Sequence, residues 1–166
     1  MADRARMQVI PADSRAATYQ VHFDEVVGVV GAGDTAGELL LIRTVTAPGQ
    51  GSPFHTHPAR EVFYIVEGRF AFITLHDGAV ARYEAGAGAV IHVPPEVPHR
   101  YENVGERDGH MLVLFTPGAA MQAFFAAVDR LSHGPAEALQ PGTPEYLAES
   151  RAIGLAHGLR RVSEPA

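Results

Sequence analysis

The sequence contains no cysteine and no lysine among its 166 residues. Without cysteine, the chain has no disulfide bond, no thiolate nucleophile and no cysteine-ligated zinc or iron–sulfur site. All 13 basic residues are arginine, so a Schiff-base lysine and the lysine of a phosphate-binding loop are excluded as well. These two absences therefore remove several common classes of enzyme from consideration.

The sequence also lacks a basic run, a signal peptide and a long apolar segment. Its formal net charge is −6, which argues against a nucleic-acid partner. Residues 1–7 contain no apolar core of a signal peptide, and no segment approaches the length of a membrane span. We therefore expect a cytoplasmic protein that does not associate with membranes.

What is present is the composition and length of one globular domain. Hydrophobic residues make up 46% of the chain and charged residues 19%, which is typical of a folded protein rather than a disordered one. A chain of 166 residues buries roughly 70% of its unfolded surface. No repeat, low-complexity tract or linker divides the sequence, so we predict a single domain.

Between residues 19 and 117 the sequence consists of short segments typical of β-strands. They are rich in β-branched and aromatic residues, and glycine, proline or Asp-Gly pairs separate them. The predicted strands are residues 19–30, 39–46, 61–67, 69–76, 79–84, 89–93, 99–104 and 110–116. Asp77-Gly78 is a strong signal for a two-residue hairpin, and Gly68 marks a tight reversal. So many short strands predict an all-β fold, a closed antiparallel barrel or jelly roll that hides the strand edges.

After residue 118 the pattern changes, because apolar residues recur at helical spacing. The apolar face of this first predicted helix consists of Met121, Phe124, Phe125, Val128 and Leu131. Thr143-Pro144 has the form of a helix start, an N-cap residue followed by proline, and a second helix runs to about His157. The predicted parts are an N-terminal arm (1–18), a β-barrel (19–117) and a C-terminal helical extension (118–166). We expect the extension to pack on the barrel, either as structural support or as a lid.

One stretch, residues 49–68, carries the strongest chemical signal. His55 and His57 are two residues apart, so on an extended chain both imidazoles point to the same face. A bend at residues 58–60 would re-aim the chain so that Glu61 converges with them. Two imidazoles and a carboxylate on one small surface indicate a metal site that still lacks a ligand.

Two segments resemble the paired motifs of the cupin superfamily. The first motif is matched by Gly49, His55, His57, Glu61 and Gly68. The second motif is matched by Gly88, Pro94, His99 and Asn103. One position departs from the pattern, since the glycine usual two residues after the proline is Glu96 here. Both motifs together are specific, because two strands and a hairpin separate them.

The resemblance implies a cupin β-barrel, a double-stranded β-helix or jelly roll, followed here by two C-terminal α-helices. It also implies that His55, His57, Glu61 and His99 converge on one divalent transition metal. Three imidazoles and one carboxylate suit Fe, Ni, Co, Mn, Cu or Zn, and the ligand types do not choose among these metals.

A substrate pocket is expected beside the metal. If Glu61 faces inward, the period of two residues along a strand turns Phe63 and Ile65 inward, and His99 does the same for Tyr101. On the last strand either His110, Leu112 and Leu114 or Met111, Val113 and Phe115 face inward. The predicted pocket residues are Phe54, Phe63, Ile65, Tyr101, His110 and Leu112. This lining favours an apolar or aromatic substrate, and Arg43 is the lone candidate for binding an anionic group.

The barrel, the ligand set and the pair of helices are similar to those of quercetin 2,3-dioxygenase-like single-domain cupins. That similarity implies a metal-dependent dioxygenase for a small aromatic or enolic substrate, such as a flavonol, a diketone or a catechol. Glu61 would be both a ligand and the catalytic base that takes a proton from a substrate hydroxyl. The base needs a raised pKa, which we expect an apolar pocket to supply.

Two other functions are compatible with the same residues, because one barrel carries many chemistries. The protein could be a non-redox isomerase, decarboxylase or lyase in which the metal acts only as a Lewis acid. It could also bind a small molecule without turnover. Besides the small-molecule substrate, we expect a second copy of the chain as a partner. Residues 26–30 and 39–42 carry more apolar side chains than one barrel wall needs, which favours a homodimer.

Overall fold

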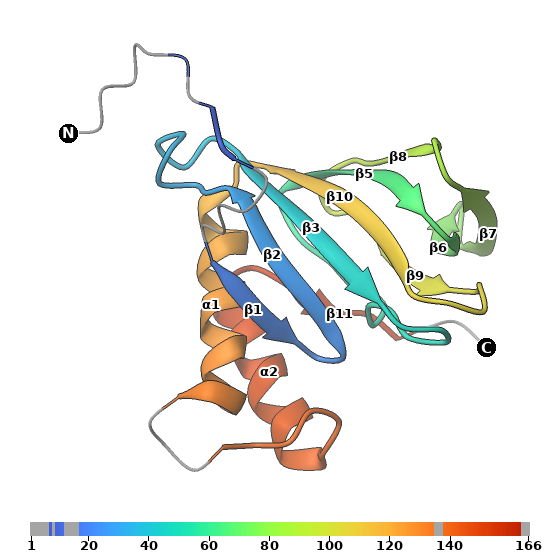
Figure 1. Cartoon of the computed structure of the whole chain (residues 1–166). Coiled ribbons are helices and arrows are strands. Elements are labelled where there is room, and N and C mark those ends of the chain that lie inside the picture. The colour runs from blue at the N-terminus through green and yellow to red at the C-terminus, as the bar shows by residue number, and fades with distance from the viewer. Residues whose placement is uncertain (1–6, 8, 12–16, 135–137, 164–166) are drawn as a thin grey trace.

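Two antiparallel β-sheets face each other in the computed structural model, which describes Met7 and residues 9–11, 17–134 and 138–163 (Figure 1). The larger sheet has six strands, in the order β1 (Thr18–Val21), β2 (Asp24–Val30), β3 (Leu40–Thr46), β10 (Gly109–Thr116), β5 (Arg60–Glu67) and β8 (Val90–Val93). The smaller sheet has five strands, in the order β11 (Arg160–Arg161), β4 (His55–Thr56), β9 (His99–Asn103), β6 (Arg69–His76) and β7 (Ala79–Gly86). The predicted all-β jelly roll is confirmed.

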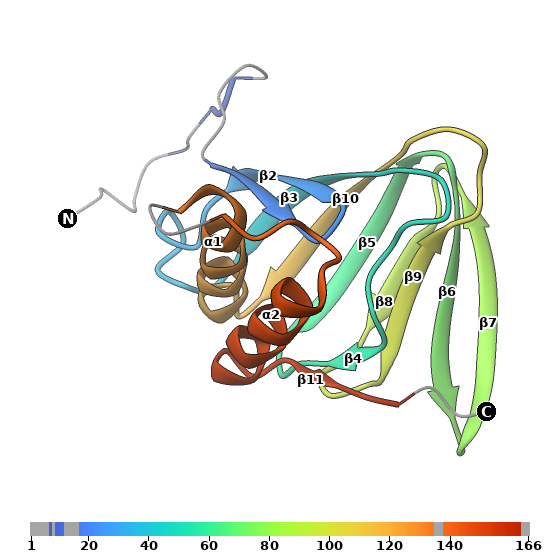
Figure 2. The same ribbon diagram turned by 90° about the horizontal axis from the view of Figure 1, so that it is seen from below.

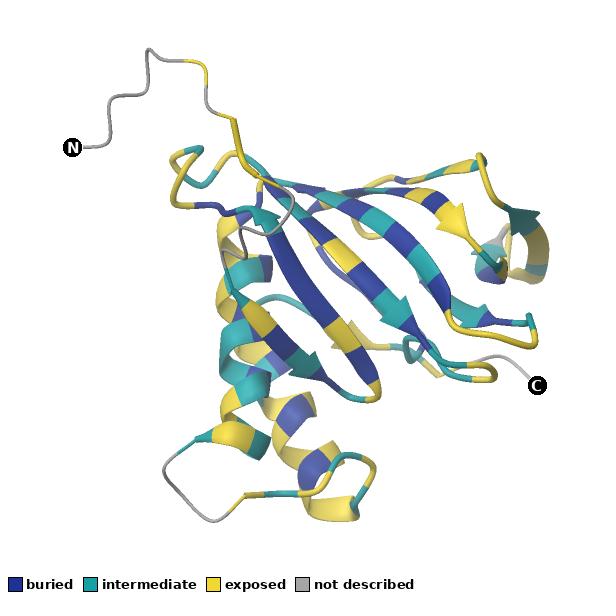
Figure 3. Ribbon diagram, in the orientation of Figure 1, coloured by how far each residue is buried: buried dark blue, intermediate teal, exposed yellow. Residues whose placement is uncertain are grey.

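The middle of the larger sheet shows why these segments form strands. Side chains along β10 alternate between buried and half-buried positions, and β3 and β5 alternate in a similar way (Figure 3). Met111, Val113 and Phe115 face the core and are at most 3% exposed, which fixes the parity of β10 that the sequence left open. His110 and Leu112 consequently lie on the other face of the strand. Burial of each such apolar side chain contributes about 1.5–3 kcal/mol, so a shift of register by one residue would be costly.

Two of the predicted turns take a different form. Residues 19–30 make two strands rather than one, because the chain turns at His22-Phe23, where His22 has a φ of 55°. Gly68, with a φ of 97°, does not close a hairpin: it takes the chain from β5 in one sheet to β6 in the other. The hairpin at Asp77-Gly78 is confirmed, since β6 pairs with β7 and the two turn residues have φ values of 50° and 77°, the combination that a type I′ turn requires.

Two helices follow the barrel, as predicted: α1 (Ala119–His133) and α2 (Pro144–Ala156). Thr143 caps α2 by accepting a hydrogen bond from the backbone N–H of Tyr146 at 3.3 Å. The buried face of α1 belongs to the same hydrophobic core as the strands. Helix α1 packs against β1 and β3, and α2 lies between α1 and β11 (Figure 2). The C-terminal part of the chain therefore packs against the barrel and closes one side of it.

Two short strands, β4 and β11, were not expected from the sequence. They extend the smaller sheet, because β11 pairs with β4 and β4 pairs with β9. Of the predicted N-terminal arm, residues 1–6, 8 and 12–16 lie outside the described residues. None of the described helices has the length and apolar character needed to cross a membrane.

Candidate metal centre

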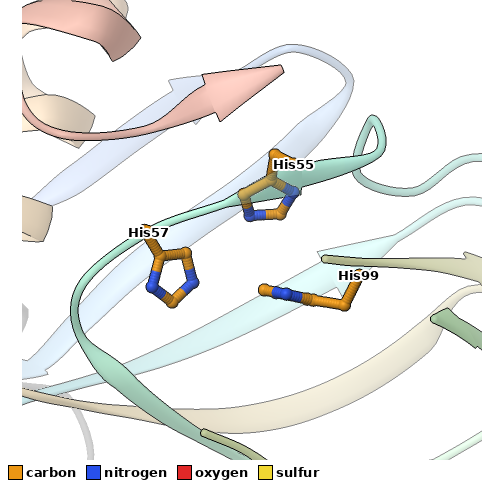
Figure 4. Close-up of side chains that lie close together, drawn as sticks. All are labelled: His55, His57 and His99. Atoms are coloured by element: carbon orange, nitrogen blue, oxygen red, sulfur yellow. The ribbon is translucent and has the colours of Figure 1, made fainter. Parts of the chain in front are cut away.

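His55, His57 and His99 lie side by side inside the barrel (Figure 4). His55 opens β4 and pairs directly with His99, the first residue of β9, while His57 follows β4. One ring nitrogen from each histidine lies within 4.8 Å of the other two, so the three rings could hold a metal ion. The spacing that predicted a common direction for His55 and His57 is explained by the extended chain at β4, which points alternate residues to one face.

The backbone fixes the orientation of each imidazole. All three rings donate a hydrogen bond from Nδ1 to a nearby carbonyl oxygen, since a carbonyl can only accept. The pairs are His55 with Pro53 (2.7 Å), His57 with Ala59 (2.9 Å) and His99 with Val97 (2.8 Å). With the proton held on Nδ1, the lone pair of each neutral ring is on Nε2. Such a partner behind a histidine is the usual way in which a protein orients a metal ligand.

Glu61 lies between two of these rings and is only 5% exposed. Its Oε2 is 3.0 Å from Nε2 of His57 and 2.9 Å from Nε2 of His99. Both rings already carry a proton on Nδ1. The two short contacts therefore require either a second proton on each ring, at Nε2, or a cation bound by Oε2 of Glu61 and both Nε2 atoms. Burying these groups without such compensation would be strongly unfavourable. The donor set of three imidazoles and one carboxylate thus fits a divalent transition metal.

The electrostatics of the group favour an ionised carboxylate. Burial by itself would raise the pKa of Glu61, but the hydrogen bonds to His57 and His99 outweigh burial and lower the pKa to about 2. This direction is opposite to the raised pKa that we expected for a base at this position. Burial lowers the pKa of His55 to about 3, which keeps that ring neutral. The pKa of His99 is lowered by burial but raised more strongly by Glu61, so the net shift is upward.

Glu96, the residue that departs from the cupin pattern, has the backbone conformation that glycine prefers. Its φ is 62°, in the left-handed region that costs a residue with a Cβ about 1–2 kcal/mol. Its N–H donates a 2.9 Å hydrogen bond to the carbonyl oxygen of His57. The turn before His99 is thereby tied to the segment that carries the other two histidines.

A cavity of about 100 Å³ extends from this group toward the helices. Its described lining contains Val21, His22, Asp24, Val26, Ile42, Thr44, Gly51, Ser52, Pro53, His55, Glu61, Phe63, Tyr101, Val113, Phe115, Met121, Phe124, Phe125, Ser150, Arg151, Gly154, Leu159 and Arg161. The barrel supplies most of the polar groups, and α1 supplies three apolar side chains. The helical extension therefore forms part of the wall.

The structure places only two of the six predicted pocket residues, Phe63 and Tyr101, on this cavity. Ile65 faces inward as predicted but is fully buried in the hydrophobic core. Phe54 alternates with His55 and packs in a separate cluster with Ala71 and Ile73.

His110 and Leu112 are also wrong as pocket residues, because they alternate with the inward-facing residues of β10.

Several lining residues were missed from the sequence. Arg43, the candidate for an anion, is exposed on β3 and is not part of the lining, whereas Arg151 of α2 and Arg161 of β11 are. Burial and the nearby charge of Arg151 lower the pKa of Arg161. Neither arginine has an ion-pair partner in the part of the chain that the structure describes. A two-residue strand such as β11 carries no periodicity, so the sequence offered no signal that Arg161 lines the cavity.

The sequence is similar to one known domain family and to two other proteins. Residues 42–115 match the family model described as the cupin domain. Acireductone dioxygenase of Gluconobacter oxydans (strain 621H) is 28% identical over 130 residues, which cover 76% of this chain and 69% of that protein. An uncharacterized protein of Methanocaldococcus jannaschii is 33% identical over 66 residues, which cover 39% of this chain and 50% of that protein.

Solved structures share the fold at low sequence identity. A predicted oxalate decarboxylase from Thermotoga maritima has a TM-score of 0.58 at 19% identity, covering 66% of this chain and 98% of that chain. The polyketide cyclase RemF from Streptomyces resistomycificus has a TM-score of 0.57 at 19% identity, covering 68% of this chain and 80% of that chain. These proteins differ in activity, so the likeness extends to the fold alone. With its two facing sheets, the chain has the jelly-roll fold of the cupins, and its residues 42–115 are similar to the cupin domain.

Proposed function

We propose that this protein is a metal-dependent dioxygenase acting on a small aromatic or enolic molecule, in the manner of the quercetin 2,3-dioxygenase-like cupins. His55, His57, His99 and Glu61 would hold one divalent transition metal. The observation that carries the proposal is the common orientation of three imidazoles, each with Nδ1 bound to a carbonyl, beside a mostly apolar cavity whose lining includes His55 and Glu61. The similarity to an acireductone dioxygenase supports the class of reaction.

The cavity limits the size and charge of the substrate. Its volume of about 100 Å³ is somewhat less than that of an apolar cavity of ~150 Å³ that admits benzene. A catechol, a short diketone or another enol fits this space better than a three-ring flavonol does. Arg151 and Arg161 on the exposed side of the cavity favour a substrate that carries a negative charge, such as a carboxylate or an enolate.

The residues of the chain have separate roles in this scheme. A bound metal would supply Lewis acidity and a position for oxygen. Glu61 would accept a proton from an acidic hydroxyl of the substrate, such as that of an enol or a catechol, since the pKa of this carboxyl is low. The aromatic side chains of Phe63, Phe115 and Phe125 would exclude water from the reacting groups.

Metal analysis followed by oxygen uptake tests the proposal. Protein purified without chelator should contain close to one transition metal per chain, and oxygen uptake should appear with catechol, acetylacetone or a flavonol after loading with Fe, Ni, Co or Mn. His57→Gln should lose the metal, while the matched variant His110→Gln, on the outward face of β10, should keep it. Turnover that is unchanged without oxygen would instead indicate a non-redox enzyme, and binding without any product would leave a binding protein.

A further inference from the structure

Asp24, the first residue of β2, places a second carboxyl group in the cavity that contains the candidate metal ligands. It is 6% exposed, and Tyr101 donates a 2.5 Å hydrogen bond from its hydroxyl to Oδ2. The other oxygen, Oδ1, is buried and has no hydrogen-bond partner among the described residues. Thr44, on the neighbouring strand β3, also lines the cavity, and its hydroxyl is buried without a partner in that same part of the chain.

A purely structural role does not account for this carboxyl group. The contact with Tyr101 joins β2 of the larger sheet to β9 of the smaller one, but it uses only one of the two oxygens. Burial raises the pKa of Asp24 to about 6, even though Tyr101 and the nearby hydroxyl of Thr46 lower it. The hydroxyl of Thr46 is near enough to affect this pKa. It does not meet the geometry of a hydrogen bond to Asp24, and it has no partner among the described residues. A buried acceptor that lacks a donor is unfavourable unless something else supplies one.

We propose that Asp24, assisted by Thr44, forms a polar subsite that accepts a hydrogen bond from an O–H or N–H group of the substrate. The surrounding wall is apolar, with Val26, Ile42 and Val113, so a donor bound there is shielded from water. The preferred ligand is then a phenol, an enol or an amide, and an ether of the same size is rejected, because it leaves the acceptor unpaired. Asp24 would hold a substrate in this way only if the cavity takes a small organic molecule, as the proposed function states.

Two isomers of one formula provide the test. 4-Methylphenol carries an O–H donor and methoxybenzene carries none, although the two have the same number of heavy atoms. Their binding to the metal-free full-length chain is measured by isothermal titration calorimetry, so the result does not depend on metal loading or on oxygen chemistry. The wild-type protein should prefer 4-methylphenol by about tenfold, as expected for a hydrogen bond to a charged acceptor.

Asp24→Asn should remove this preference. The amide oxygen of the variant accepts the hydrogen bond from the hydroxyl of Tyr101, which turns the amide N–H₂ toward the cavity as a donor. Glu25→Gln is the matched control, because Glu25 is the adjacent carboxylate on the exposed face of the same strand, and it should bind like the wild type. Circular dichroism verifies the fold of each variant.

Tyr101→Phe gives a second readout that does not depend on the asparagine variant. This variant keeps the carboxylate of Asp24 and removes the hydroxyl that donates to its Oδ2. The preference for 4-methylphenol should therefore remain or increase. Loss of the preference in Tyr101→Phe would overturn the assignment to Asp24 in favour of the tyrosine hydroxyl. An unchanged preference in Asp24→Asn, or equal or undetectable binding of the two isomers to the wild type, would overturn the subsite. Failure of oxygen uptake with a retained phenol preference would instead refute the proposed reaction alone.

Discussion

Glu61 is subject to two opposing effects, burial and the contacts with His57 and His99, and the contacts determine its charge. A carboxylate with a pKa of about 2 is a good metal ligand and a weak base. Glutamine keeps the size and one oxygen of this side chain but cannot accept a proton. We expect Glu61→Gln to retain most of its metal and to lose oxygen uptake by about 10²–10⁴-fold, the usual contribution of general base catalysis. Metal content and oxygen consumption, measured on one preparation, test this; full activity would show that another group is the base.

Asp24 should make the stability of the fold depend on pH. Its pKa rises from 3.8 to about 6 on folding, so the native state favours the protonated form. Ionisation therefore destabilises the fold as pH rises from about 4 to 6, and the penalty is complete above that range. Relative to wild type, Asp24→Asn should gain about 2–3 kcal/mol in free energy of unfolding between pH 4 and pH 7, from a shift of about two pKa units. Urea denaturation of both proteins at the two pH values measures this gain, and a constant difference would contradict it.

At the scale of single residues, the sequence predicted those that belong to a motif and missed those placed by tertiary structure. The spacing of His55, His57 and Glu61 was sufficient to predict their convergence, because an extended chain and a bend determine it locally. His99 lies far along the chain and was implied only by the resemblance to the cupins. Asp24 carried no such signal. Its inward position depends on the turn at His22-Phe23, where a histidine rather than a glycine takes the positive φ.

Among the elements, long strands were predicted well and very short ones were missed. Strands such as β10 bury alternate residues over eight positions, which a sequence displays directly. β4 and β11 contain two residues each and exist because they pair with each other and with β9. The same limit explains why Arg161 of β11 was missed as a cavity residue, while Arg43 of β3, which lies outside the cavity, was considered instead.

The end of the C-terminal extension should determine the affinity for anions. Arg151 and Arg161 come from α2 and β11 and line one cavity without a described acidic partner. Replacing both with glutamine should weaken the binding of benzoate by about tenfold or more, as expected for charged hydrogen bonds, and should leave benzyl alcohol nearly unaffected. Arg43→Gln, an exposed position outside the cavity, is the control. Equal losses for both ligands would indicate damage to the wall rather than loss of charge recognition.

For the whole molecule, the homodimer remains a prediction, but the surface expected to form it has changed. Val26 and Leu40, from the strands first considered, are buried in the core at 3% and 1% exposure. Exposed apolar side chains lie instead on β5 and β8, at Tyr64, Val66 and Val90, where Tyr64 pairs with Val90. We expect sedimentation to give a mass near twice 17.7 kDa and Val90→Glu to reduce it to that of one chain. A monomeric wild type would contradict the prediction.

Metal binding should stabilise the entire fold, because its four candidate ligands join both sheets. His55 and His99 belong to the smaller sheet and Glu61 to β5 of the larger one. A metal that binds only the native state at 100 times its Kd contributes about 2.7 kcal/mol, which for a chain of this size raises Tm by about 5–10 °C. Thermal unfolding with and without EDTA should show this difference in the wild type and in His110→Gln, and His57→Gln should lose most of it. If chelation shifts Tm equally in both variants, the metal that stabilises the protein is bound elsewhere than between the two sheets.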